Sequence, residues 1–203
     1  MNFLAHLYLS GSDEDIMVGN FAGDFIKGRQ ALLHLPPKIK LGVELHRHID
    51  EFTDKHAIVD ESKRRLRPKY RHYAGIIVDI FYDHYLAKNW HTYANKLLPD
   101  FADHCYQILE SRKDLPKEMS YMLPYMVKGN WLVNYTFLQG IERALKGMSN
   151  RTKYDSKMNE SIIDLQEHYN AFKKEFETFF PELIGTCNQF LNEHQLPQIK
   201  TPS

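Results

Sequence analysis

Cysteine, net charge and long apolar runs are all scarce in this chain of 203 residues. The two cysteines, Cys105 and Cys187, lie far apart in the sequence, which excludes a disulfide framework and a cysteine zinc motif. Lysine plus arginine and aspartate plus glutamate each number 26, so the formal net charge is zero. Zero net charge argues against a general nucleic-acid-binding protein. No stretch approaches the ~18 consecutive apolar residues of a membrane span.

These absences also predict where the protein works. So few cysteines are typical of a reducing compartment. Residues 1–6 have neither the basic region nor the long apolar region of a signal peptide. We therefore expect a cytoplasmic protein with no nucleic-acid and no membrane partner, and the sequence leaves its oligomeric state open.

Helical periodicity is what the chain does have, along most of its length. The expected helices cover residues 13–27, 37–51, 54–68, 70–88, 90–111, 116–128, 130–147 and 155–192. Pro124 and Pro181 are expected to kink or break the later helices. The predicted fold class is all-α, with a single helical domain over residues 1–195 and a flexible tail over residues 196–203.

The expected helix 70–88 is the most informative segment. Its residues 74–87 are apolar almost all the way round, which is typical of a buried helix. It nevertheless carries Asp79 and Asp83, four residues apart and therefore on one face. Burying unpaired carboxylates costs several kcal/mol, and a cation between them removes that cost. We predict a metal or catalytic role for both; the alternative is that they pair with Lys or Arg, or face water.

Two further helices repeat this pattern. His46 and Asp50 lie one turn apart on the apolar arc of helix 37–51 and can converge on one cation. In helix 13–27, Asn20 and Asp24 are also four residues apart, although Asp24 could equally belong to ordinary helix-end chemistry. Helical proteins build metal sites in this way, from side chains on several buried faces. Oxygen-rich ligation with one or two histidines favours Mn²⁺, Mg²⁺ or iron over structural zinc.

His6 and a basic run complete the candidates. His6 lies in an apolar segment, where a histidine is usually a hydrogen-bonded core residue. The run consists of six basic residues within ten: Lys63, Arg64, Arg65, Arg67, Lys69 and Arg71. It is either a solvated helix end, where cations are favourable, or a docking patch for an acidic partner.

Four segments of this sequence resemble the acyl carrier protein phosphodiesterase family. They are residues 1–7 (MNFLAHL), 19–28 (GNFAGDFIKG), 45–54 (LHRHIDEFTD) and 73–84 (YAGIIVDIFYDH), in that order. The similarity is strong over roughly the first 90 residues and looser to about residue 180. Several ordered motifs make coincidence a poor explanation.

The resemblance implies a fold and an activity. It implies an all-helical bundle like that of the HD phosphohydrolases, dependent on Mn²⁺ or Mg²⁺. The implied reaction removes 4′-phosphopantetheine from holo acyl carrier protein, the protein substrate, and leaves the apo protein. The chain departs from HD enzymes in one respect, because His46 and Asp50 are a turn apart rather than adjacent.

The resemblance also assigns roles. Asp24, His46, Asp50 and Asp79 are the implied metal-site residues, and Asp83, His6 and His84 form a second tier. On this hypothesis Asp79 helps to activate the attacking water, His84 or His6 protonates the leaving serine oxygen, and the basic run meets the acidic carrier protein.

Two alternatives stay open. One is a phosphohydrolase of the same fold that acts on a nucleotide or another small phosphodiester. The other is a non-enzymatic binding module for an acidic protein, with the buried polar residues forming a core network. Metal analysis separates the binding module from both enzymes, and a gel-shift assay of holo carrier protein separates the two enzymes.

Overall fold

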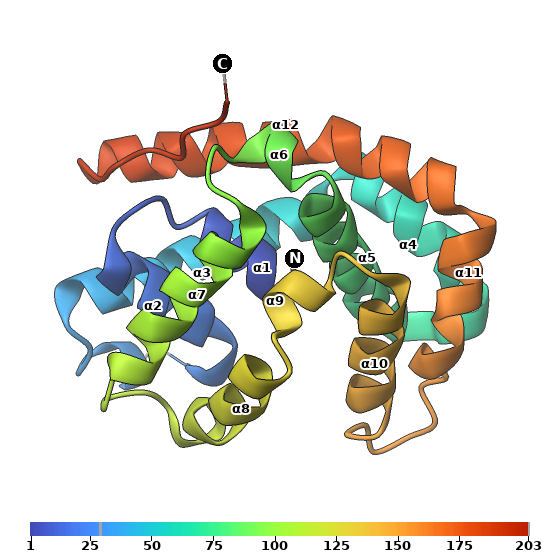
Figure 1. The fold of residues 1–203 in the computed structure, drawn as a ribbon, viewed down its shortest axis with the longest axis horizontal. Coiled ribbons are helices and arrows are strands. Elements are labelled where there is room, and N and C mark those ends of the chain that lie inside the picture. The colour runs from blue at the N-terminus through green and yellow to red at the C-terminus, as the bar shows by residue number, and fades with distance from the viewer. Residues whose placement is uncertain (29, 203) are drawn as a thin grey trace.

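All regular secondary structure is helical in the computed structural model, which describes residues 1–28 and 30–202 (Figure 1). The all-α prediction is therefore confirmed. The α-helices are α1 (Phe3–Tyr8), α2 (Glu14–Ala22), α3 (Pro37–Lys55), α4 (Ala57–Tyr70), α5 (Ala74–Lys88), α6 (Trp90–Tyr93), α7 (Leu98–Ser111), α8 (Lys117–Lys128), α9 (Trp131–Asn134), α10 (Leu138–Ser149), α11 (Ser161–Glu167) and α12 (Tyr169–Glu193). Short 3₁₀ turns are η1 (Gly23–Phe25), η2 (Gln30–Leu32), η3 (Arg71–Tyr73) and η4 (Met158–Glu160).

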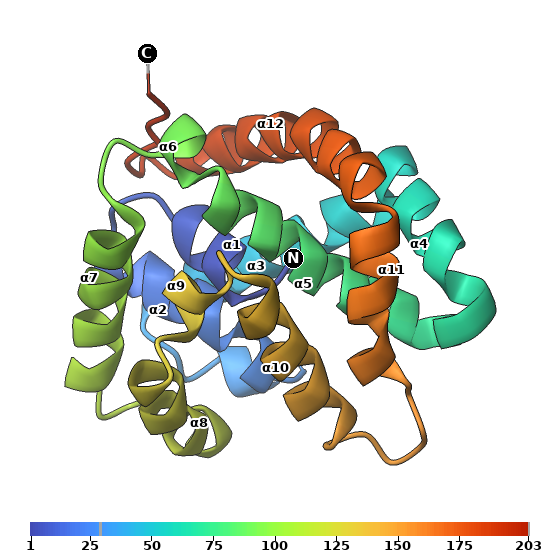
Figure 2. The same ribbon diagram turned by 45° about the vertical axis from the view of Figure 1, so that its right-hand side comes forward.

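Helix α5 lies at the centre of the fold. It contacts α1, α4, α10 and α12, and Figures 1 and 2 show these helices arranged around it. The long helix α12 covers one side of α5 with Phe176 and Phe179, which pack against the rings of Tyr82 and Tyr85. Each fully buried aromatic ring of this kind contributes about 2 kcal/mol through the hydrophobic effect. This packing explains why an almost wholly apolar helix is stable at this place.

Prolines do not end the helices in which they occur. Pro124 lies inside α8 and Pro181 inside α12, so neither proline breaks its helix, and the alternative expectation of a kink stays a prediction. A proline removes one backbone hydrogen bond. In α12 the loss is offset by packing, because the neighbouring Phe179, Phe180 and Leu183 are all fully buried.

Helices α2 and α3 approach each other closely at two glycines. A Cβ at Gly19 would collide with the carbonyl of Ile39, and a Cβ at Gly42 would collide with the carbonyl of Ile16. Glycine is therefore required at both positions for the backbones to meet. At Gly23, a Cβ would overlap the ring of His46. These contacts bring the end of α2 and the following η1 turn against the middle of α3.

The C-terminal segment packs against the last helix. Residues 196–202 run back beside α12, where the backbone N–H of Ile199 donates to Asn188 Oδ1 at 2.7 Å. The predicted flexibility of residues 196–203 stays a prediction, and Ser203 lies outside the described residues.

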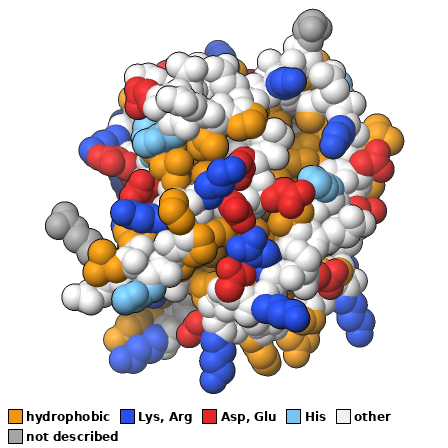
Figure 3. Space-filling view, turned by 90° about the vertical axis from the view of Figure 1, so that its left-hand side faces the viewer, with side chains coloured by type: hydrophobic (Ala, Val, Ile, Leu, Met, Phe, Trp, Pro, Cys, Tyr) orange, Lys and Arg blue, Asp and Glu red, His pale blue; other side chains and the backbone are white. Residues whose placement is uncertain are grey.

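No helix in the described part of the chain is both long and apolar enough to cross a bilayer. Figure 3 shows one face on which Lys and Arg side chains lie beside Asp and Glu side chains.

Candidate active site and metal centre

Two histidines and a carboxylate converge where α1 meets α3. His6 Nε2 lies 3.3 Å from Asp50 Oδ1, and His46 Nε2 lies 3.1 Å from Asp50 Oδ2. The two imidazole rings stack with centroids 4.1 Å apart. One ligand atom from each of the three residues lies within 4.8 Å of the other two. Both histidines are buried, while Asp50 is half-buried and faces a cleft.

Asn20 fixes the orientation of both imidazoles. Its side-chain N–H groups donate to the backbone oxygen of His6 at 2.8 Å and to Ser10 Oγ at 2.9 Å, which places Oδ1 toward the His6 ring. His6 Nδ1 then donates to Asn20 Oδ1, and His46 Nδ1 donates to the Asn20 backbone oxygen, both at 2.8 Å. Because carbonyl oxygens only accept, the neutral rings carry their lone pairs on Nε2. Both lone pairs therefore point at the position that Asp50 faces, as in histidines that ligate metals.

Asp24 and Asp79 lie at the edge of this cluster. Asp24 Oδ1 is 3.4 Å from His46 Nε2, and its side chain is 63% exposed. Asp79 Oδ1 is 3.0 Å from the amino group of Met1, which is itself 4.0 Å from Asp50 Oδ1. Asp24, Asp50 and Asp79 all line one cleft of about 280 Å³. The structure thus brings together four of the predicted metal residues and adds His6 to them.

The charges in the cluster balance only in part. Burial would lower the pKa of His46, but hydrogen bonds to Asp24 and Asp50 outweigh it and raise that pKa to about 9. For Asp50, burial is likewise outweighed, chiefly by the hydrogen bond from protonated His46, so its pKa falls well below the usual range. Burial and the neighbouring His46 lower the pKa of His6. One protonated imidazole thus neutralises one carboxylate, and a divalent cation could take the place of that proton.

The donor set fits a divalent cation. It offers two imidazole nitrogens of fixed orientation and a carboxylate oxygen of Asp50 within 4.8 Å of one another, with Asp24 Oδ1 3.4 Å from His46 Nε2 at the edge. Mixed nitrogen and oxygen ligands suit Mn²⁺ or Fe²⁺ better than Mg²⁺ or Ca²⁺, which prefer oxygen alone.

Asp83 is not brought into this cluster. It is fully buried, and its carboxylate accepts the backbone N–H groups of Asn2, Leu4 and Ala5 at 3.3, 2.8 and 3.3 Å. Burial raises the pKa of Asp83 to about 7, against the opposite effect of the Met1 amino group and these N–H donors. Asp83 therefore holds the start of α1, and through it His6, in place.

Replacing Asp83 by alanine should lower the free energy of unfolding by about 3 kcal/mol, because three buried N–H groups lose their acceptor. Urea denaturation followed by circular dichroism measures this change. The matched control is Asp103→Ala on the exposed face of α7, for which we expect a change within about 0.5 kcal/mol. A loss below about 1 kcal/mol for Asp83→Ala would show that the carboxylate does not stabilise α1.

His84 also faces away from the cluster. Its Nδ1 donates to the Tyr135 backbone oxygen, and its Nε2 accepts from the Tyr169 hydroxyl, both at 2.8 Å. Burial lowers the pKa of His84. Because both ring nitrogens are occupied by groups of the protein, His84 lacks a free nitrogen with which to protonate a leaving group.

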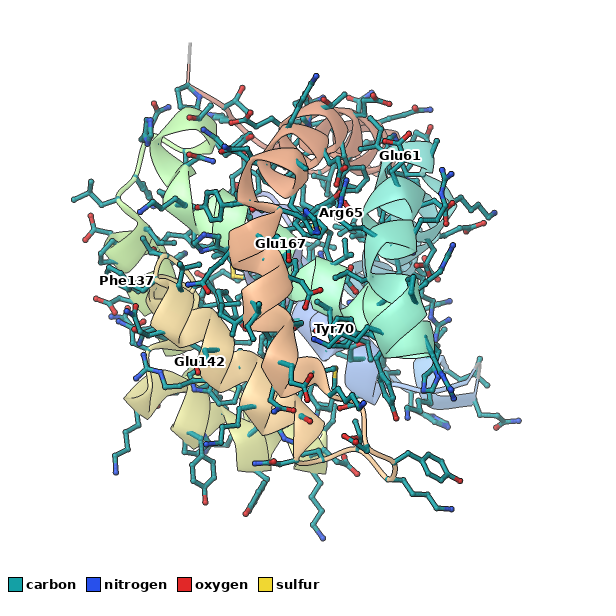
Figure 4. All side chains as sticks on the ribbon, turned by 90° about the vertical axis from the view of Figure 1, so that its right-hand side faces the viewer. Glu61, Arg65, Tyr70, Phe137, Glu142 and Glu167 are labelled. Carbon is teal, nitrogen blue, oxygen red and sulfur yellow. The ribbon has the colours of Figure 1, made fainter. Side chains whose placement is uncertain are left out.

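The basic run is largely paired within the protein. Arg65 makes two hydrogen bonds to the Glu175 carboxylate, at 2.9 and 2.6 Å, and Lys63 lies 2.6 Å from Asp54. Arg64 and Arg67 both pair with Asp60. Lys69 lies within 4 Å of Glu160 and Asp164, and Arg71 begins η3 with a φ of 52°. Figure 4 shows Arg65 and Tyr70 lying between α4 and the adjoining helices α11 and α12. Internal pairing reduces the positive field that this helix presents to a partner.

Two functional features escape sequence reasoning. The Met1 amino group pairs with a carboxylate 78 residues away, and no local pattern marks such a contact. The double role of Asn20 is also invisible, although a polar residue four positions before Asp24 is a partial signal.

The chain resembles one family along most of its length. Residues 1–183 match the family model described as acyl carrier protein phosphodiesterase. An acyl carrier protein phosphodiesterase of Yersinia pestis is 33% identical over 186 residues, which cover 91% of this chain and 96% of the relative. Its counterpart in Escherichia coli (strain K12 / DH10B) is 32% identical over 195 residues, 93% of this chain and 98% of the relative. No solved structure matches the chain.

Proposed function

The chain belongs to the acyl carrier protein phosphodiesterase family, and from this premise we propose that it is a divalent-cation-dependent hydrolase of holo acyl carrier protein. The bond cleaved would be the phosphodiester between 4′-phosphopantetheine and the serine of the carrier protein. The observation that carries the proposal is the convergence of His6, His46 and Asp50 on one point, within a chain that matches this family.

His6, His46 and Asp50 would hold the cation, with Asp24 at the open side of the cluster. A bound divalent cation supplies Lewis-acid stabilisation of a phosphoryl oxygen and activates water for attack. His6 belongs among the ligands rather than the proton donors, because its Nε2 faces the cation position and its Nδ1 is held by Asn20.

The remaining chemistry needs a proton acceptor and a phosphodiester in the cleft. Asp79 is 29% exposed and lines the cleft beside Asp50, so it can accept the proton of the attacking water. Water would then add to phosphorus, the bond from phosphorus to the serine oxygen would break, and that oxygen would take up the proton that Asp79 accepted. The products are the apo carrier protein and 4′-phosphopantetheine. Mn²⁺ is the expected metal, because the carboxylates suit it and the two imidazole ligands disfavour Mg²⁺.

The direct test is a gel-shift assay of holo acyl carrier protein with and without Mn²⁺. Conversion to the apo form only with Mn²⁺ would support the proposal. Cleavage of nucleotides or simple phosphodiesters without cleavage of the holo carrier protein would instead favour a small-molecule phosphohydrolase.

The basic run is proposed as the docking surface for the acidic carrier protein. Its exposed members are Arg64, Arg67, Lys69 and Arg71. Replacing the three exposed arginines by alanine should raise KM for holo carrier protein about tenfold at low salt, through loss of electrostatic steering. The difference should shrink as salt is raised, with kcat unchanged. A matched control replaces the exposed Lys174 on α12 and Lys117 and Lys128 on α8. An unchanged KM in the arginine variant would remove the docking role.

A further inference from the structure

A second cavity opens beside the carboxylate cleft. It has a volume of about 200 Å³ and lies among α9, α10 and the first residues of the chain. Its walls are mostly apolar and include Phe3, Trp131, Tyr135, Ala144 and Met148. Asn2 and Met148 line both this cavity and the cleft that holds Asp24, Asp50 and Asp79. The cavity therefore adjoins the cleft of the candidate metal site, and the two share these wall residues.

The second of the two glycines on α10 leaves this cavity open. Gly147 lines it, and a Cβ at this position would meet nothing closer than Arg151 Nη2 at 4.0 Å. Its neighbours Trp131, Ala144 and Met148 are only half-buried, so a ligand in the cavity would remove further apolar surface from water. Two polar residues also line the cavity: Arg143 and Asn134, with Arg143 Nη2 donating to Asn134 Oδ1 at 3.2 Å.

We propose that this cavity binds the pantetheine arm of the substrate, an inference that rests on the function proposed above. The phosphodiester would be bound at the cation that His6, His46 and Asp50 hold. It would join the carrier protein on one side to the pantetheine arm on the other. A folded protein cannot enter a cavity of about 200 Å³, whereas a narrow chain of methylenes, amides and a gem-dimethyl group can.

The size and lining of the cavity favour this occupant. Pockets for drug-sized ligands measure about 300–1,000 Å³, so this cavity suits a thin chain better than a nucleotide. Its apolar walls match the methylenes and methyl groups, and Arg143 and Asn134 can donate to the amide oxygens. Asp54 also lines the cleft and pairs with Lys63 of the basic run, so we expect the carrier protein at Asp54 and the arm at Met148.

The test is a fluorescence titration with free pantetheine, since Trp131 lines the cavity and Trp90 is buried elsewhere. Wild-type protein should show a saturable change in emission that is absent in Trp131→Phe. Gly147→Leu fills the cavity and should weaken pantetheine binding at least tenfold, with KM for holo carrier protein raised about as much. Leucine favours helix over glycine, so the fold should survive. Ala144→Leu is a second cavity-filling variant.

The matched control is Gly185→Leu on α12, where a Cβ also meets open space; it should leave pantetheine binding and KM unchanged. Mn²⁺ affinity should stay the same in all these variants. No emission change in wild type, or equal pantetheine binding by wild type and Gly147→Leu, would overturn the proposal. Pantetheine binding that Gly147→Leu abolishes, in a protein unable to cleave holo carrier protein, would support the cavity and refute the proposed activity.

Discussion

Replacing Asp50 by asparagine is expected to lower kcat toward holo acyl carrier protein by about 1,000-fold, while the protein remains folded. Asparagine keeps the shape of the side chain but removes the charge that faces both His6 Nε2 and His46 Nε2. A catalytic metal contributes several kcal/mol to the transition state. A loss of about 4 kcal/mol of this transition-state stabilisation corresponds to a kcat lower by about 1,000-fold. Steady-state assays of purified protein, with circular dichroism as the check on folding, measure the effect.

Glu44→Gln is the matched control for Asp50→Asn. Glu44 lies on the same helix, α3, but its carboxylate pairs with Lys40 at 3.9 Å rather than with the histidines. Its loss should change kcat by less than about twofold, since surface ion pairs of this kind contribute little. An Asp50→Asn variant with kcat near that of the wild type would show that the cluster is not the catalytic site.

Removal of metal is expected to abolish activity altogether. Dialysis against a chelator should reduce turnover to background, and Mn²⁺ should restore it more fully than Mg²⁺ or Ca²⁺, because two of the ligands are imidazoles. Metal should also stabilise the native state. At about 100 times Kd the gain is about 2.7 kcal/mol, which raises Tm by about 5–10 °C for a chain of this size.

Thermal melts and activity should change together in this experiment. The His46→Gln variant serves as its control, because it keeps the fold but loses one ligand and should show a smaller rise in Tm with Mn²⁺. Full activity after exhaustive chelation, with no metal detected in the protein, would refute the metal-dependent mechanism.

The longer helices could be predicted from local pattern, whereas the short α1, which carries His6, was not among those expected. Apolar periodicity located α3 and α5, and the spacing of four residues placed His46 and Asp50 on one face, as the structure has them. Local information fixes these features, because they depend on neighbours within one or two turns.

Long-range partners could not be predicted in the same way. Asp79 and Asp83 both sit on the buried helix α5, yet one lines the cleft and the other caps α1 through residues about 80 positions away. A buried carboxylate needs compensation, but the sequence does not say whether a cation or a set of N–H groups supplies it. The basic run shows the same limit, because Glu175, the partner of Arg65, lies 110 residues further along the chain.

The central claim is that His6, His46 and Asp50 hold one divalent cation. Pulsed electron paramagnetic resonance of Mn²⁺ bound to the purified protein tests it most directly, because it detects nitrogen coordinated to the ion. We predict couplings from two imidazole nitrogens in the wild type and from one in His46→Gln. Mn²⁺ bound without any coupled nitrogen, or no Mn²⁺ bound at all, would contradict the account.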